Sequence, residues 1–188
     1  FPWVAGYALP DHLLLCGCLW ALYFFFRFFQ SRATGSEGAN RDLYLGALFL
    51  GLAELSKYNA AFLGVGVAAY VLVYDRKLFA QPRLYLAAAL ALVLQTPTII
   101  WNLTENFASW DFILRGRHAG LKAEIDGIVP LVFGIFIFIS PFLFWPIGVF
   151  AVSSKNTVPG EGFARATFAI SSVAIVVLSF SDMKYFFE

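Results

Sequence analysis

Long apolar runs alternate with short polar stretches along most of this 188-residue chain. A helix needs roughly 20 residues to cross a hydrocarbon core about 30 Å thick, and several of the runs approach that length. The pattern therefore predicts an all-α fold, a polytopic bundle of transmembrane helices in a single domain. The expected crossing segments are approximately 13–29, 43–56, 59–74, 84–101, 128–152 and 166–180, with an outer loop over 102–127.

The stretch 43–74 allows two interpretations, because Glu54 and Lys57 interrupt it near its middle. As one helix, it would place both ionisable groups deep in the bilayer, at about 2.5 to 3.5 kcal/mol each. As a hairpin of two short helices, it would place Lys57 and Tyr58 in an outer turn. The insertion cost favours the hairpin, whereas the distribution of Lys and Arg hardly separates the two interpretations.

Basic residues set the expected orientation of the bundle. Arg27, Arg32 and Arg41 follow the first apolar run, so the positive-inside rule places this end in the cytoplasm. The basic connections 75–83 and 153–166 then fall on the same side. The remaining polar positions are expected on the outer side of the membrane. They are Asp11, the turn at Lys57, the loop 102–127 and the terminal stretch 181–188.

The composition agrees with a membrane protein. Charged residues make up 13% of the chain, against about 25% in globular domains. The formal net charge of +1 excludes nucleic-acid binding through a strong overall charge. The sequence contains no P-loop, dinucleotide fingerprint or Cys/His metal spacing. Gly46, Gly51 and the stretch 64–66 are expected at close contacts between helices.

The stretch WNLTENFASWDFILRGRHAG, residues 101–120, concentrates polar and aromatic residues in the predicted outer loop. Trp101 taken alone is typical of the aromatic belt at a membrane surface. Arg115, Arg117 and His118 are more specific, because a guanidinium group binds phosphate through two parallel hydrogen bonds. The residue chemistry leaves two ligands open: a lipid-linked phosphate, or the phosphates of ordinary lipids.

The order and spacing of several motifs resemble the bacterial GT-C membrane glycosyltransferases of the protein-mannosyltransferase and aminoarabinose-transferase kind. The similar stretches are LPDHLLL at 9–15, LGLAELSKYNAAFLGVG at 50–66, TPTIIWNLTENFASWDFILRGRHAG at 96–120 and SFSDMKYFFE at 179–188. The resemblance implies a multi-pass enzyme of the inner membrane with its active site facing the periplasm. Such an enzyme moves a hexosyl or pentosyl group from a polyprenyl-phosphate donor to a glycolipid such as lipid A, a polysaccharide or a protein.

The resemblance also implies roles for individual residues. Asp11 and Glu105 are the candidate catalytic residues in this chain, where they could position the acceptor or a divalent metal ion, and no other cofactor is implied; relatives often have His at the position of Glu105. The chain begins at Phe1 and is expected to be a fragment, so the catalytic base is expected outside it. The implied donor-phosphate ligands are Lys57, Arg115, Arg117, His118 and Lys184, and the implied substrate-positioning residues are Tyr58, Trp101 and Asn102.

Two other functions compete with sugar transfer. A transporter or flippase of lipid-linked sugars would bind the same headgroup in outer charged loops without chemistry. A non-catalytic membrane scaffold is the third interpretation. Transporters usually contain inverted repeats, and this sequence contains no second copy of any segment. Sugar transfer is therefore the leading prediction.

Overall fold

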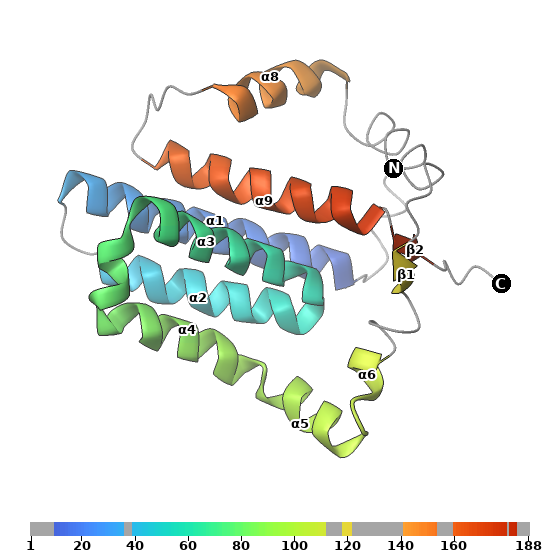
Figure 1. The fold of residues 1–188 in the computed structure, drawn as a ribbon. Coiled ribbons are helices and arrows are strands. Elements are labelled where there is room, and N and C mark those ends of the chain that lie inside the picture. Colours follow the sequence, from blue (N-terminus) through green and yellow to red (C-terminus); the bar gives the residue numbers. More distant parts are fainter. Residues whose placement is uncertain are drawn as a thin grey trace. The chain divides into compact units, whose positions relative to one another are not determined.

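The computed structural model describes residues 10–35, 39–111, 118–121, 141–153, 160–179 and 181–183. These residues are almost entirely helical, which confirms the all-α prediction (Figure 1). The helices are α1 (Pro10–Thr34), α2 (Ala39–Ser56), α3 (Ala61–Tyr74), α4 (Pro82–Leu94), α5 (Thr96–Thr104), α6 (Ala108–Asp111), α8 (Pro141–Val152) and α9 (Glu161–Ser179), with short 3-10 turns η2 (Tyr58–Ala60) and η3 (Arg76–Ala80). A small antiparallel ribbon of β1 (His118–Leu121) and β2 (Ser181–Met183) was not predicted.

The chain forms two compact units, residues 1–97 with 155–170 and residues 98–154 with 171–188. The core of the first unit lies between α1, α2, α3 and the first half of α9. Phe163 is completely buried there, with its ring centroid 4.9 Å from that of Phe29 and 5.6 Å from that of Tyr70. Interlocked aromatic rings of this kind hold helices together beyond the burial of their area alone.

The segment 43–74 is broken at Lys57, as the hairpin interpretation requires. The α-helix stops at Ser56, and Lys57 has extended backbone angles, φ −160° and ψ 133°. The next helix, α3, packs back against α2. A Cβ added at Gly64 of α3 would lie 3.4 Å from the Leu50 side chain and 3.9 Å from a Glu54 carboxylate oxygen, both on α2. The structure therefore excludes one continuous helix over 43–74 and places Lys57 at the turn.

Glycines lie at close helix contacts, as the sequence predicts. A Cβ added at Gly46 would lie 2.7 Å from the Phe25 ring. At Gly66, the added atom would lie 2.9 Å from the Thr167 methyl group and 3.0 Å from the Thr167 Cα atom. These distances leave no room for a side chain, so glycine sets how closely the helices approach.

The predicted single segment 84–101 is broken in the structure. Helix α4 ends at Leu94, α5 begins at Thr96, and the two are bent by 51°. Pro97 explains the break, because it has no N–H to donate to the Val93 carbonyl and its ring clashes there. The Thr96 hydroxyl donates to that carbonyl instead, at 2.6 Å. The Gln95 side-chain amide donates to the Gly51 carbonyl at 2.8 Å, and this hydrogen bond attaches the end of α4 to α2.

Two segments predicted as loops are partly regular structure. The connection predicted over 153–166 is shorter in the structure, because α9 already begins at Glu161. The helix starts directly after Gly160, whose φ is +93°. Arg165 then binds Glu161 across one helical turn at 2.6 Å, which favours the helix. The predicted outer loop 102–127 likewise contains the end of α5, the helix α6 and the strand β1.

Within the described residues, one helix is by itself long and apolar enough to cross a bilayer, Asp11–Thr34. The bent pair α4 and α5 would add a second if it crosses as one span. The apolar segment Tyr58–Tyr74 is shorter. The remaining crossing segments, including 128–152, whose first part lies outside the described residues, stay predictions.

Arg32 joins two connections at the end of the first unit opposite Lys57. Its Nε atom donates to an Asp75 carboxylate oxygen at 2.7 Å, and its Nη1 atom donates to the Gln81 side-chain oxygen at 3.3 Å. The side chains of Arg32 and Asp75 are each 23% exposed, so the pair is partly shielded from water. Arg32 therefore ties the end of α1 to both ends of η3.

We expect Arg32→Ala to lower the free energy of unfolding by about 1 to 3 kcal/mol, because Asp75 would lose the charged donor to its shielded carboxylate. Arg76→Ala is the matched control, since its exposed guanidinium donates to the backbone carbonyl of Leu72, four residues earlier at the end of α3, at 2.7 Å and not to a carboxylate. Thermal unfolding in detergent measures both effects. Equal effects of the two substitutions would contradict the bridging role.

Candidate functional site

Lys57 and Asp11 form an ion pair at one end of the first unit. The Lys57 Nζ atom lies 2.5 Å from an Asp11 carboxylate oxygen, and the side chains are 39% and 57% exposed. The structure thus brings these two predicted site residues together. An ammonium group has three donors. Asp11 takes one of them, so Lys57 can still donate to a phosphate.

The helix break positions Lys57. Its backbone N–H donates to the Ala53 carbonyl at 3.0 Å, and its carbonyl accepts from the Ala60 N–H at 3.2 Å. Both sides of the turn are thus fixed, while the side chain extends from the carboxyl end of α2. The partial negative charge of that helix end favours a cation there. Tyr58, the next residue, is 40% exposed.

Glu54 is absent from the predicted site residues, although it lies one helical turn before Lys57 on α2. Its side chain is half-buried, and no ion pair links it to another described residue. In the predicted topology α2 crosses the membrane, and an ionisable group in such a helix marks a functional candidate because retaining it there is costly. The Glu-x-x-Lys spacing beside a helix break was the signal that could have identified it.

Asn102 holds the turn between α5 and α6 in the second unit. It is completely buried; its side-chain amide donates to the Thr98 carbonyl at 2.9 Å and accepts from the Trp110 N–H at 3.3 Å. Its own carbonyl accepts from the Phe107 N–H at 2.6 Å. The amide is therefore engaged within the fold, and any effect of Asn102 on a substrate passes through the shape of this turn.

The same turn carries Glu105 in an exposed position. Asn106 and Phe107 have left-handed backbone angles, φ 52° and 60°, which bulky residues rarely adopt. Such strained turns cluster at functional sites. Trp101 is 49% exposed at the preceding helix surface, consistent with an interfacial anchor.

Arg115, Arg117 and Lys184 lie outside the described residues, as does the side chain of His118. The backbone of the ribbon is described, and it pairs His118 with Met183 and Leu121 with Ser181. In sequence, Arg117 directly precedes His118 and Lys184 directly follows Met183. The ribbon thus joins the two distant stretches from which phosphate ligands were predicted.

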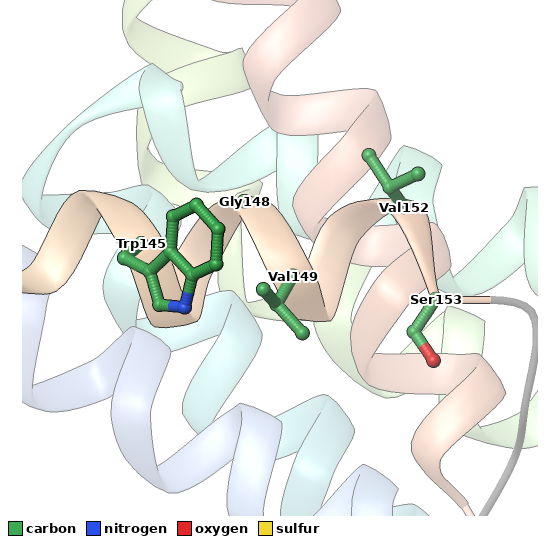
Figure 2. A pocket seen from close by; sticks show the side chains of 5 residues that line it. All are labelled: Trp145, Gly148, Val149, Val152 and Ser153. Atoms are coloured by element: carbon green, nitrogen blue, oxygen red, sulfur yellow. The ribbon is translucent and has the colours of Figure 1, made fainter.

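An open pocket of about 500 Å³ lies along α8. Figure 2 shows the side chains that line it, from Trp145, Gly148, Val149, Val152 and Ser153. Its lining is mainly apolar and includes none of the predicted site residues. A surface of this kind suits hydrocarbon rather than a phosphate or sugar. Within the described residues, no three His, Cys, Asp or Glu side chains are grouped to hold a metal ion.

Residues 3–101 match the sequence pattern of the family described as dolichyl-phosphate-mannose-protein mannosyltransferase. This match covers just over half of the chain and includes the Asp11–Lys57 pair. The chain belongs to this family. The same comparisons find no match among curated proteins and none among solved structures.

Membership of the mannosyltransferase family confirms the GT-C resemblance seen in the sequence. The chain is accordingly assigned to an integral membrane glycosyltransferase of the mannosyltransferase type. The matched segment contains α1 to α4, the helix break at Lys57 and the bend at Gln95. It ends at Trp101, so the Arg115–Arg117 stretch and the ribbon lie beyond it.

Proposed function

We propose that this protein transfers a sugar from a polyprenyl-phosphate donor to a glycolipid, polysaccharide or protein on the extracytoplasmic face of the bacterial inner membrane. The observation that carries the proposal is the exposed Lys57–Asp11 pair at a helix break inside the family segment. An oriented ammonium group at the end of a membrane helix suits a phosphate at the headgroup level.

Sugar transfer from such a donor breaks the bond between the anomeric carbon and the phosphate oxygen. The acceptor oxygen forms the new bond to that carbon and loses its proton to a base. The departing lipid phosphate gains negative charge, which preorganised cations stabilise. Lys57 supplies one such cation, and Asp11 orients it through the 2.5 Å contact.

Asp11 is poorly placed to be the base, because its carboxylate already binds the ammonium group of Lys57. Glu105 is exposed in a strained turn and remains the candidate for positioning the acceptor. The base itself is assigned to no residue of this chain. Tyr58 and Trp101 are proposed to contact the sugar or the lipid headgroup with their exposed aromatic faces.

Arg115, Arg117, His118 and Lys184 are proposed as the remaining phosphate ligands. The pairing of β1 with β2 supports this grouping, because it brings the backbones of His118 and Met183 into register. Arg117 and Lys184 adjoin this pair in the sequence, and their guanidinium and ammonium groups are proposed to bind the same phosphate. Arginine and lysine contribute differently here, since only the guanidinium binds two phosphate oxygens in parallel.

We expect Arg117→Ala to lower sugar transfer by about 10- to 100-fold, the loss of one or two charge-assisted hydrogen bonds of about 1.5 to 3 kcal/mol. The assay follows labelled sugar from a polyprenyl-phosphate donor to an acceptor fraction, with the natural full-length protein in proteoliposomes. Arg117→Lys keeps the charge and should give an intermediate rate. An unchanged rate in Arg117→Ala would remove this residue from the site.

The wild-type protein tests the function itself in the same assay. A glycosyltransferase releases free polyprenyl phosphate as it transfers the sugar. A transporter or flippase would move the intact donor across the membrane and leave the sugar attached. Translocation of intact donor without release of polyprenyl phosphate would therefore overturn the proposal in favour of a carrier.

A further inference from the structure

We infer that the end of the first unit opposite Lys57 is a binding site for the phosphate headgroups of anionic lipids. We call this surface the basic end, and it consists of Arg41, Arg76, Lys77 and Arg83. The inference is independent of sugar transfer, because it concerns residues that play no part in the proposed donor site.

Contacts between elements gather these four cations at one end. The Arg83 guanidinium donates to the Asn40 side-chain oxygen at 2.7 Å, which joins the start of α4 to the start of α2 beside Arg41. Asp75, which precedes Arg76 in sequence, is bound by Arg32 near the end of α1. Figure 1 shows the same arrangement, with the ends of α1 and α3 near the starts of α2 and α4.

The described carboxylates at this end already have partners. Arg27 binds Asp42 at 3.3 Å, and Asp42 is only 5% exposed. Arg32 binds Asp75 at 2.7 Å.

The four residues of the basic end are all exposed, and the hydrogen bonds of Arg76 and Arg83 go to neutral oxygens, the Leu72 carbonyl and the Asn40 side chain. Their positive charge is therefore in surplus among the described residues. A surplus of clustered, exposed cations attracts anions.

The surroundings of the basic end favour a lipid over a soluble phosphate. Tyr74 and Tyr85 are 67% and 58% exposed, and Phe79, which lies between Lys77 and Arg83 in the sequence, is also exposed. Exposed tyrosines beside Lys and Arg are typical of the membrane interface, where the rings lie at headgroup level. Next to them, α3 and α4 expose large apolar side chains suited to acyl chains, namely Leu72, Val73 and Leu86.

The chemistry of the ligand follows from the donors. Each of the three guanidinium groups can donate two parallel hydrogen bonds to phosphate oxygens, and the ammonium group adds single hydrogen bonds. A phosphodiester headgroup with net negative charge, such as that of phosphatidylglycerol, satisfies them, whereas the zwitterionic headgroup of phosphatidylcholine offers its own competing cation. The basic end should therefore select lipids by charge, as juxtamembrane Lys and Arg clusters do.

Native mass spectrometry of the full-length protein in detergent tests this inference by comparing bound phosphatidylglycerol with bound phosphatidylcholine. We expect the wild type to prefer phosphatidylglycerol and the triple variant Arg76→Gln/Lys77→Gln/Arg83→Gln to bind it on the order of 100-fold more weakly, the combined effect of three interfacial cations. The matched control Arg76→Lys/Arg83→Lys keeps the charge and should keep most of the preference.

Further measurements distinguish a lipid site from a site for a soluble anion, and lost binding from an unfolded variant. Millimolar inorganic phosphate should not displace the lipid; displacement would assign the site to a soluble anion and overturn the inference. Circular dichroism checks the fold of the triple variant. If that variant unfolds, Lys77→Gln alone carries the test, because Lys77 is exposed and the loss of its charge should weaken binding severalfold. Unchanged phosphatidylglycerol binding in a folded variant would contradict the inference.

Discussion

Lys57→Ala is expected to slow sugar transfer by about 100-fold or more, because removing one preorganised donor from a developing anion costs that much in other enzymes. The structure fixes the backbone of Lys57 at a helix break through two hydrogen bonds. The fold should survive, since an exposed ion pair contributes at most about 1 kcal/mol to stability. Turnover in proteoliposomes and thermal unfolding in detergent measure the two quantities separately.

The pair with Asp11 makes a sharper version of this experiment possible. The double variant Asp11→Lys/Lys57→Asp restores an ion pair between the same positions but moves the cation to the start of α1. If Lys57 acts on the phosphate, this variant should stay as slow as Lys57→Ala. Recovery of transfer would show that the pair matters only as a link between helices.

Two single variants complete the comparison. Asp11→Ala is expected to have a smaller effect than Lys57→Ala, about tenfold or less, because it frees the ammonium group from its orienting partner without removing it. Lys155→Ala is the matched lysine control, since Lys155 lies in the connection predicted on the cytoplasmic side and outside the proposed donor site. A loss in Lys155→Ala equal to that in Lys57→Ala would contradict a specific role for Lys57.

Gly17→Ala is expected to lower the free energy of unfolding by about 1 to 3 kcal/mol, the usual cost of forcing one more group into a packed interior. The added Cβ would lie 2.8 Å from the Ala53 Cβ atom and 3.2 Å from the Ala53 Cα atom. Because one of these neighbours is backbone, the contact can relax only if α1 and α2 move apart.

Gly148→Ala is the matched control for this prediction. It also adds one methyl group within a helix, but nothing lies within 4 Å of the new atom. Its effect should be neutral or stabilising by up to about 1 kcal/mol, since alanine favours helix over glycine. Equal melting temperatures for the two variants would show that α1 and α2 are not packed as closely as the structure has them.

The Gly17 contact also bears on the site. Ala53 lies about one turn before Lys57, and Gly17 lies in the α1 helix that begins beside Asp11. Separating α1 from α2 here would lengthen the 2.5 Å contact of the ion pair. Gly17→Ala should therefore lower sugar transfer as well as stability, whereas Gly148→Ala should not.

Some features missed in the sequence had a local signal. Pro97 marks the break between α4 and α5, because a proline removes the hydrogen bond to the fourth residue before it. The spacing of Glu161 and Arg165 marks the early start of α9. The proline signal was outweighed by the apolar run around it, which gives the length of a segment but not a bend within it, and the Glu161–Arg165 signal was outweighed by the polar residues of the connection 153–166.

Other features had no local signal. Asn102 belongs to a stretch that resembles a substrate loop, yet its amide bonds to Thr98 and Trp110 and is completely buried. The ribbon pairs His118 with Met183, which are far apart in the sequence. Neither arrangement follows from the residues themselves, because each depends on which backbone groups the fold brings close.

By itself the sequence determined the helical class, the turn at Lys57 and the close-packing glycines, since each follows from the local cost of burying charge or from the size of one residue. It also indicated the glycosyltransferase family, which the match over residues 3–101 confirms. Only the tertiary structure decided that Lys57 is paired with Asp11 and that the carboxylates Asp42 and Asp75 are engaged by Arg27 and Arg32. These contacts join residues that are far apart in the sequence. Their distances depend on how the helices pack, which no short stretch of sequence determines.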